Sequence, residues 1–111
     1  MNDQEKSVML ARAMEWTVTA SLTNDRQYIS PPNRPDSEDY ITDLYDPANM
    51  ALAWRVHLWA HYSAEVNHGY RYRNWCIRDT DTLFNENAQR LWLDKILELA
   101  IEAGLVEVKD D

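Results

Sequence analysis

The feature that most constrains this chain is a proline-rich stretch, SPPNRPDSEDYITD, at residues 30–43. It holds three prolines, at positions 31, 32 and 35. Proline lacks the backbone N–H that a sheet ladder needs, so the stretch predicts a long loop instead of a strand. The sequence on either side is too short to bury a core of its own. The 111 residues therefore predict a single domain, 1–111, with an acidic, proline-containing loop at residues 30–46.

Apolar residues that recur with helical periodicity predict three helices, at residues 3–16, 48–66 and 85–103. The second begins at Asp46-Pro47, because aspartate caps a helix N-terminus and proline at the first helical position loses no hydrogen bond. Gly69 and Gly104 follow the second and third helices, where glycine's access to positive φ ends a helix. The second helix is apolar around much of its girth and is expected to be central and mostly covered.

Strands are predicted where β-branched and aromatic residues gather. Residues 17–22 and 26–29 flank a turn signal, Asn24-Asp25, and are expected to pair. Tyr70–Arg78 predicts a further strand, and LVEV at residues 105–108 predicts a short edge strand. This order of elements is typical of an α+β domain in which about three helices pack a small, mainly antiparallel sheet.

The formal net charge is −8, from 19 acidic and 11 basic residues. A surface of this charge repels phosphates over most of its area, which argues against direct nucleic-acid binding. Cys76 is the single cysteine, so no internal disulfide can form and a reducing compartment is expected. Neither a signal peptide nor an apolar run of about 18 residues is visible. The sequence therefore predicts a soluble cytoplasmic protein that does not enter the membrane.

Three stretches, in order along the chain, carry a family resemblance. They are LARAMEW at residues 10–16, YDPANMALAWRVHLWA at residues 45–60 and LDKILELAIEAGL at residues 93–105. Together they resemble the phage ABA sandwich domain family of small phage and prophage proteins. The resemblance implies an α/β/α sandwich-like fold, a phage origin and core positions for Trp16 and Trp54. It implies no chemistry, and the acidic loop and the Arg-rich strand depart from the family pattern.

GYRYRNWCIR, at residues 69–78, holds three arginines, two tyrosines and one tryptophan, and no acid. In a strand, alternate residues of this stretch lie on opposite faces. Arginines interleaved with aromatic side chains bind phosphates and stack on bases. The candidate ligand-binding residues are Arg71, Tyr72, Arg73, Trp75 and Arg78. The alternative is a structural strand whose arginines pair with the protein's own carboxylates.

His57, His61, Glu65 and His68 lie along one stripe of the second predicted helix. Histidines four residues apart can share a metal ion, but His57 and His68 are about 16 Å apart along the helix axis, too far for a common site. We therefore interpret the stripe as a polar seam and expect no metal or cofactor. Cys76 is expected to be a small buried residue, since no His-Asp arrangement completes a nucleophile.

The acidic loop offers a different kind of surface. It holds five acids between Asp36 and Asp46 and no base among them, and it lacks the glycine and the spacing of a calcium loop. Such carboxylates suit a basic protein surface, which they attract over a distance, and neighbouring tyrosines serve as aromatic anchors. The candidate partner-binding residues are Asp36, Glu38, Asp39, Tyr40, Asp43 and Tyr45.

These features predict a binding protein and not an enzyme, because the sequence lacks a P-loop, GxGxxG and GxSxG. The leading hypothesis is a phage accessory protein that binds and inhibits a host protein with a basic surface, as a counter-defence, anti-CRISPR-like inhibitor in the host cytoplasm. The alternative is a small-ligand module that holds a nucleotide or other phosphate through residues 70–78. Exposed apolar area at Trp59 or Tyr62 leaves a homodimer open.

Overall fold

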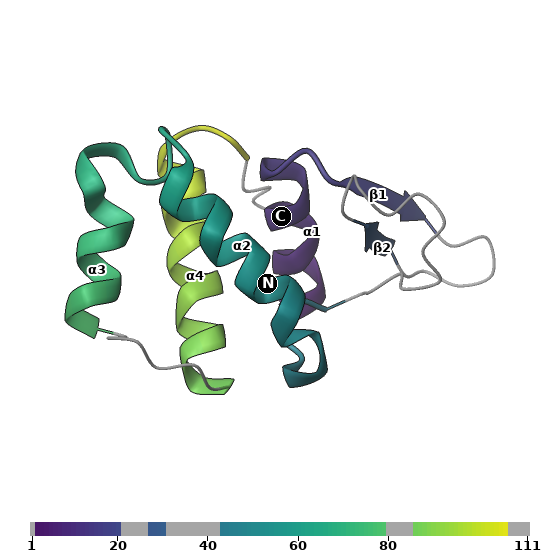
Figure 1. The fold of residues 1–111 in the computed structure, drawn as a ribbon. Helices are drawn as coiled ribbons and strands as arrows, with labels where there is room; N and C mark the ends of the chain where they lie inside the picture. Colours follow the sequence, from purple (N-terminus) through teal and green to yellow (C-terminus); the bar gives the residue numbers. More distant parts are fainter. Residues whose placement is uncertain (1, 21–26, 31–42, 80–85, 107–111) are drawn as a thin grey trace.

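The computed structural model describes residues 2–20, 27–30, 43–79 and 86–106. Its α-helices are α1 (Asp3–Ala13), α2 (Met50–Tyr62), α3 (Arg71–Asp79) and α4 (Glu86–Glu102). Its strands are β1 (Thr17–Ala20) and β2 (Gln27–Ser30), and single 3-10 turns, η1 (Pro47–Asn49) and η2 (His68–Tyr70), precede α2 and α3. The predicted α+β class is confirmed (Figure 1). No helix in these ranges is both long enough and apolar enough to cross a membrane.

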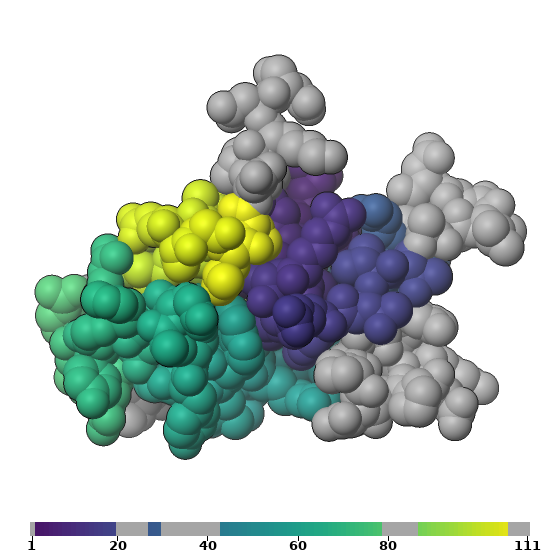
Figure 2. Space-filling model, turned by 90° about the horizontal axis from the view of Figure 1, so that it is seen from above, coloured from purple at the N-terminus to yellow at the C-terminus, as the bar shows by residue number. Residues whose placement is uncertain are grey.

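The two strands form an antiparallel hairpin that packs on α1. Val18 pairs with Ile29 and Thr19 with Tyr28, as the β-branched composition predicts. The Ile29 side chain is fully buried. The hairpin lies beside α1 at one end of the molecule, and α3 lies at the other end, in both the ribbon and the view from above (Figures 1 and 2). The sheet is therefore peripheral, and the remaining helices pack mainly on one another.

α4 is the central helix, because it contacts each of the other three helices. Its buried residues Trp92, Ile96 and Ala100 recur every four positions and form a continuous apolar stripe. α2 contributes buried small residues to the same core, among them Ala53 and Ala60, which let helices approach closely. Burial of these side chains is the main stabilising contribution, at about 1.5–3 kcal/mol for each fully buried large one.

The expectation that residues 48–66 form the central, mostly covered helix is wrong. Leu58 and Tyr62 of α2 are exposed, and so in part is Trp54, which the family resemblance places in the core. α2 also ends earlier, at Tyr62, because Ser63 adopts an extended conformation with φ −76° and ψ 120°. The Asn67 side-chain amide then donates a hydrogen bond to the carbonyl oxygen of His61 at 2.9 Å. The predicted start is confirmed, since Oδ1 of Asp46 accepts the backbone N–H of Ala48.

The prediction of a strand at Tyr70–Arg78 is wrong, because residues 71–79 form α3. Tyr72 and Cys76 are four residues apart, a spacing that places two side chains on one face of either a strand or a helix. Trp75 distinguishes the two, since it lies next to Tyr72 only in a helix. The rings of Tyr72 and Trp75 stack with centroids 5.8 Å apart. Packing of these aromatic side chains against α2 and α4 favours the helix.

Two other boundaries differ from the sequence prediction. The helix predicted at 3–16 ends at Ala13, because Glu15 adopts a positive φ of 61° and the backbone turns there. Residues 105–106, predicted as the start of an edge strand, form a turn after α4. Of the two residues that could cap the first helix, Asn2 and Asp3, it is Asn2 whose Oδ1 accepts the backbone N–H of Glu5, at 2.8 Å.

Candidate functional site

α3 presents two faces, and each contributes to a distinct feature. Arg71, Asn74, Trp75 and Arg78 follow the i, i+3, i+4, i+7 spacing of a single helical face. That face and residues Lys95 and Leu99 of α4 line a hollow of about 570 Å³, which we call the basic hollow. Tyr72 and Cys76 lie on the adjoining face and are buried. The helix thus places Asn74 and Arg78 on a different face from Tyr72 and Cys76, whereas a strand would place all four on one face.

The basic hollow carries more cations than its own carboxylates neutralise. Arg71 pairs with Glu102 at 3.0 Å and Lys95 pairs with Glu98 at 3.4 Å. These four side chains are all at least a quarter exposed to solvent. Within the described ranges, no carboxylate forms an ion pair with Arg78. Among the described side chains, the hollow therefore retains one positive charge without an ion-pair partner, at Arg78.

Three of the five predicted ligand-binding residues line the basic hollow, namely Arg71, Trp75 and Arg78. Tyr72 is fully buried, so its predicted place in an exposed ligand site is wrong. Arg73 is exposed on another face of α3, and its backbone N–H donates to Oδ1 of Asn67. Lys95 was not predicted, because α4 contributes it from a distant part of the sequence.

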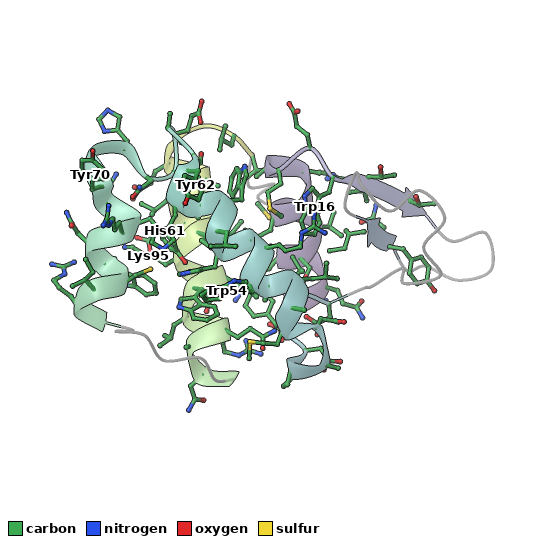
Figure 3. All side chains as sticks on the ribbon, viewed as in Figure 1. Trp16, Trp54, His61, Tyr62, Tyr70 and Lys95 are labelled. Atoms are coloured by element: carbon green, nitrogen blue, oxygen red, sulfur yellow. The ribbon has the colours of Figure 1, made fainter. Side chains whose placement is uncertain are left out.

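A buried group of polar side chains lies behind the basic hollow. We call it the imidazole–thiol cluster, and it consists of His57, His61, Tyr72 and Cys76. Nδ1 of His57 shares a hydrogen bond of 2.7 Å with the hydroxyl of Tyr72. Nε2 of His57 faces Nε2 of His61 at 3.2 Å. His61 and Lys95 both lie between α3 and the α2–α4 pair (Figure 3).

Aromatic rings enclose the imidazole–thiol cluster. Trp54 stacks on His57 with ring centroids 4.8 Å apart, and Trp92 lies 4.5 Å from His57. Tyr72 contacts the imidazoles of both His57 and His61 edge to face. Trp75 stacks on Tyr72 and also lines the basic hollow, so it joins the two features. These rings exclude water from the imidazole of His57.

Burial sets the protonation states in this cluster. It lowers the pKa of His57 to about 4, with a smaller contribution from the neighbouring His61. Burial also lowers the pKa of His61, and the positive charge of Arg73 lowers it further. Burial raises the pKa of the Tyr72 phenol, and Cys76 adds to this effect. At neutral pH the cluster therefore holds two neutral imidazoles and a protonated phenol.

The histidine stripe divides differently from the sequence prediction. His57 and His61 enter the cluster, whereas Glu65 and His68 are exposed beyond the end of α2. Cys76 is buried, as predicted, but it lies against the two imidazoles. This contact was not predicted, because Cys76 was expected in a strand. The two histidines four residues apart were the sign of it in the sequence. The third residue of a type that binds metals, Cys76, joins them only because α3 packs on α2.

Most residues of the predicted partner-binding surface lie outside the described residues, namely Asp36, Glu38, Asp39 and Tyr40. Oδ1 of Asp43 accepts the backbone N–H of Tyr45 at 2.8 Å. Tyr45 is 5% exposed, so its prediction as an exposed aromatic anchor is wrong. Its ring is held in place by two cations from other elements, Lys6 and Arg90, at 5.4 and 5.0 Å from the centroid.

The apolar residues considered for a homodimer are both on α2. Tyr62 is 87% exposed, and Trp59 is half-buried against the core. Leu58 of the same helix is also exposed, and so in part is Trp54. Exposed apolar residues are common on a monomer surface. The homodimer stays a prediction.

Comparison with known proteins gives no relative for this chain. A scan against protein-family models found no match. A search of curated proteins and a search of solved structures also found none. The resemblance to the phage ABA sandwich domain family therefore stays a prediction, and any function is inferred from the residues of the chain itself.

Proposed function

We propose that this chain is a non-enzymatic binding protein that holds a small phosphate-bearing ligand in the basic hollow. One observation carries the proposal: Arg71, Arg78 and Lys95 converge from two helices on one hollow, although the whole chain has a charge of −8. Cations gathered in a concave site attract anions to that place. The predicted alternative of a phosphate-binding module at residues 70–78 is thereby favoured over a purely structural segment.

The lining of the basic hollow suits a nucleotide better than a bare anion. Guanidinium groups form paired hydrogen bonds with phosphate oxygens, so Arg71 and Arg78 would hold the phosphate. Trp75 offers an aromatic face on which a base can stack. The volume of about 570 Å³ falls in the range of small-molecule sites. We therefore expect a phosphate and a planar ring in the ligand.

The carboxylates at the rim do not prevent this binding. Glu102 and Glu98 pair with Arg71 and Lys95 at solvent-exposed positions. Exposed ion pairs of this kind contribute about 0–1 kcal/mol each. A phosphate carries more charge and more acceptor oxygens than a carboxylate, so it competes well for the same cations.

Thermal unfolding in the presence of a nucleotide panel and of inorganic phosphate tests the proposal. A ligand at 100 times its Kd stabilises the folded protein by about 2.7 kcal/mol, which raises the melting temperature measurably. Arg78→Glu should abolish this rise, because it removes the unneutralised cation. Arg73→Glu is the matched control, since it makes the same charge change on the same helix outside the hollow.

Two results would contradict the proposal. One is that no phosphate-bearing compound raises the melting temperature of the unmodified protein. The other is that Arg73→Glu reduces the effect as much as Arg78→Glu, because the response would then report net charge and not a site. Inorganic phosphate alone producing the full effect would show that Trp75 makes no contribution and would remove the nucleotide part of the proposal.

A second function is supported by the charge of the chain and not by the geometry of the hollow. We propose that this chain is a phage accessory protein whose acidic surface binds and inhibits a host protein in the host cytoplasm. The excess of 19 acids over 11 bases supports it. Affinity capture from a bacterial lysate should yield a basic protein that is lost at high salt. Capture that survives charge reversal at Asp36, Glu38 and Asp39 would reject this function.

A further inference from the structure

We propose that His57, His61 and Cys76 form a binding site for one zinc ion in the core between α2 and α3. The inference does not depend on the proposed function, because its residues differ from those that line the basic hollow. It rests on the convergence of three ligand-type side chains from two helices.

The positions of the ligand atoms fit a single ion. One ligand atom from each of the three residues lies within 4.8 Å of the others. Zinc binds imidazole nitrogen at about 2.0–2.1 Å and thiolate sulfur at about 2.3 Å in a tetrahedral arrangement, so its ligand atoms lie roughly 3.3–3.7 Å from one another. The two Nε2 atoms, 3.2 Å apart, are close to this separation. The longest separation in the set, up to 4.8 Å, would have to shorten by about 1 Å when the ion binds.

The secondary structure makes this arrangement stable. His57 and His61 are one turn apart on α2, which points both imidazoles to the same side of the helix. Cys76 comes from α3, which contacts both α2 and α4. Each of the three side chains therefore depends on a rigid helix and not on a loop, which is the arrangement that holds ligands at fixed distances.

Tyr72 would orient one of the ligands, His57, without binding the ion itself. Its hydroxyl shares a 2.7 Å hydrogen bond with Nδ1 of His57, which leaves Nε2 of that ring to face His61. Metal-binding histidines generally use their second ring nitrogen in this way, and the bond fixes the tautomer and the orientation of the ring. Trp54 and Trp92 pack against the same imidazole and restrict its rotation further.

The donor set favours zinc over the hard cations magnesium and calcium. Two imidazoles and one thiolate suit zinc, whereas magnesium and calcium require oxygen ligands. The Cys76 thiol loses its proton when the sulfur–zinc bond forms, and the proton passes to solvent, so binding of one Zn²⁺ releases one H⁺. Three protein ligands leave a fourth coordination position, which a water molecule can fill.

Titration of the purified, metal-depleted full chain with Co²⁺ tests the site, because tetrahedral Co²⁺ absorbs visible light and a cobalt–thiolate bond adds a near-ultraviolet charge-transfer band. We expect both bands to saturate at one equivalent and to disappear on addition of one equivalent of Zn²⁺. Cys76→Ser should remove the charge-transfer band. His61→Gln should weaken Co²⁺ binding at least tenfold, and since His61 is only half-buried, this variant is expected to fold.

His68→Gln is the matched control, because His68 is an exposed histidine outside the cluster. It should leave both bands and the stoichiometry unchanged. The inference is overturned if the unmodified chain shows no tetrahedral Co²⁺ spectrum, or if the spectrum survives both His61→Gln and Cys76→Ser. It is also overturned if His68→Gln weakens binding as much as His61→Gln. None of these outcomes involves the nucleotide panel, so the two proposals fail separately.

Discussion

The hydroxyl of Tyr45 donates a hydrogen bond to Oδ1 of Asp94 at 2.8 Å, and Nζ of Lys6 approaches the same oxygen at 3.2 Å. Three separate parts of the chain meet at this carboxylate, namely α1, α4 and the segment that follows the proline-rich stretch. Burial raises the pKa of Tyr45, and Asp94 raises it further, so the phenol remains a donor. The contact fixes the position of Tyr45 against α1 and α4.

Removal of this hydroxyl should destabilise the protein without disturbing the core. We expect Tyr45→Phe to lower the free energy of unfolding by about 1 kcal/mol, because it deletes one hydrogen bond and retains the buried ring. Urea denaturation measures the change. Tyr62→Phe is the matched control, since Tyr62 is 87% exposed, and it should have no effect. Equal stability of Tyr45→Phe and the unmodified protein would contradict this prediction.

Gln89 fixes the same segment by a second contact. Its fully buried Nε2 donates to the carbonyl oxygens of Leu44 and Asp46 at 2.8 and 2.9 Å. Gln89→Leu removes the donor of the Leu44 carbonyl and one of the two donors of the Asp46 carbonyl, which still accepts from the Asn49 N–H, and it should lower the free energy of unfolding by about 2 kcal/mol. The reverse exchange at an exposed site of the same helix, Leu91→Gln, should change it by less than about 0.5 kcal/mol. Comparable effects of the two substitutions in urea denaturation would refute the prediction.

Stability should fall in mildly acidic solution because of His57. Its pKa is about 4 in the folded protein and 6.5 ordinarily, so the unfolded chain takes up a proton more readily between these two values. The free energy of unfolding is therefore constant above about pH 6.5 and decreases as the pH falls towards 4, by at most about 3 kcal/mol. Urea denaturation at a series of pH values in this window measures the decrease.

The control for this pH dependence is His57→Gln, combined with His61→Gln. The pKa of His61 is also lowered, so its contribution has the same sign. The double variant should show a nearly flat stability profile between about pH 4.5 and 7. The attribution to the two imidazoles would be wrong if the profile kept its slope, and the carboxylates would then be the cause.

α1 and α4 end in the same hydrogen-bonded turn, but the residue with positive φ is Glu15 after α1 and Gly104 after α4. After α1, Trp16 N–H bonds to Ala11 O and Glu15 has φ 61°, and after α4, Leu105 N–H bonds to Ala100 O and Gly104 has φ 77°. A positive φ strains a residue with a Cβ atom and does not strain glycine. We expect Glu15→Gly to raise the free energy of unfolding by about 0.5 kcal/mol.

The reciprocal change, Gly104→Ala, should lower the free energy of unfolding by about 1 kcal/mol. Apart from the chain neighbours of Gly104, no atom of the described residues lies within 4 Å of the added Cβ, so we attribute the effect to the backbone and not to a clash. Thermal unfolding of the two single variants measures both signs. Shifts in the same direction would show that the two helix ends are not equivalent.

Local signals predicted the elements that depend on neighbouring residues. Asn2 and Asp46 cap helical turns where they were expected to, and Gly104 follows the last helix. The hairpin follows from β-branched residues around a turn signal. These features could be predicted because capping, turns and helical periodicity are determined within a few residues of the chain.

The candidate sites could be predicted only in part, because they depend on contacts between residues far apart in the sequence. Arg71, Trp75 and Arg78 were identified as ligand-binding residues, but their common face and the contribution of Lys95 require α3 to pack on α4. Tyr45 was expected on the surface, and Asp94, 49 positions away in the sequence, holds it inside. No local pattern specifies which distant side chain will satisfy a hydroxyl.

The sequence by itself determined the α+β class, the hairpin, the start of α1, the Asp46 cap before α2 and both ends of α4, since these follow from short-range backbone preferences. The tertiary structure alone decided whether residues 71–79 form a helix, because the four-residue spacing of Tyr72 and Cys76 fits both a strand and a helix. The helical conformation of residues 71–79 places Cys76 close to His57 and His61. Burial against α2 and α4 resolved an ambiguity that periodicity could not, because it adds the packing energy of side chains far apart in the sequence.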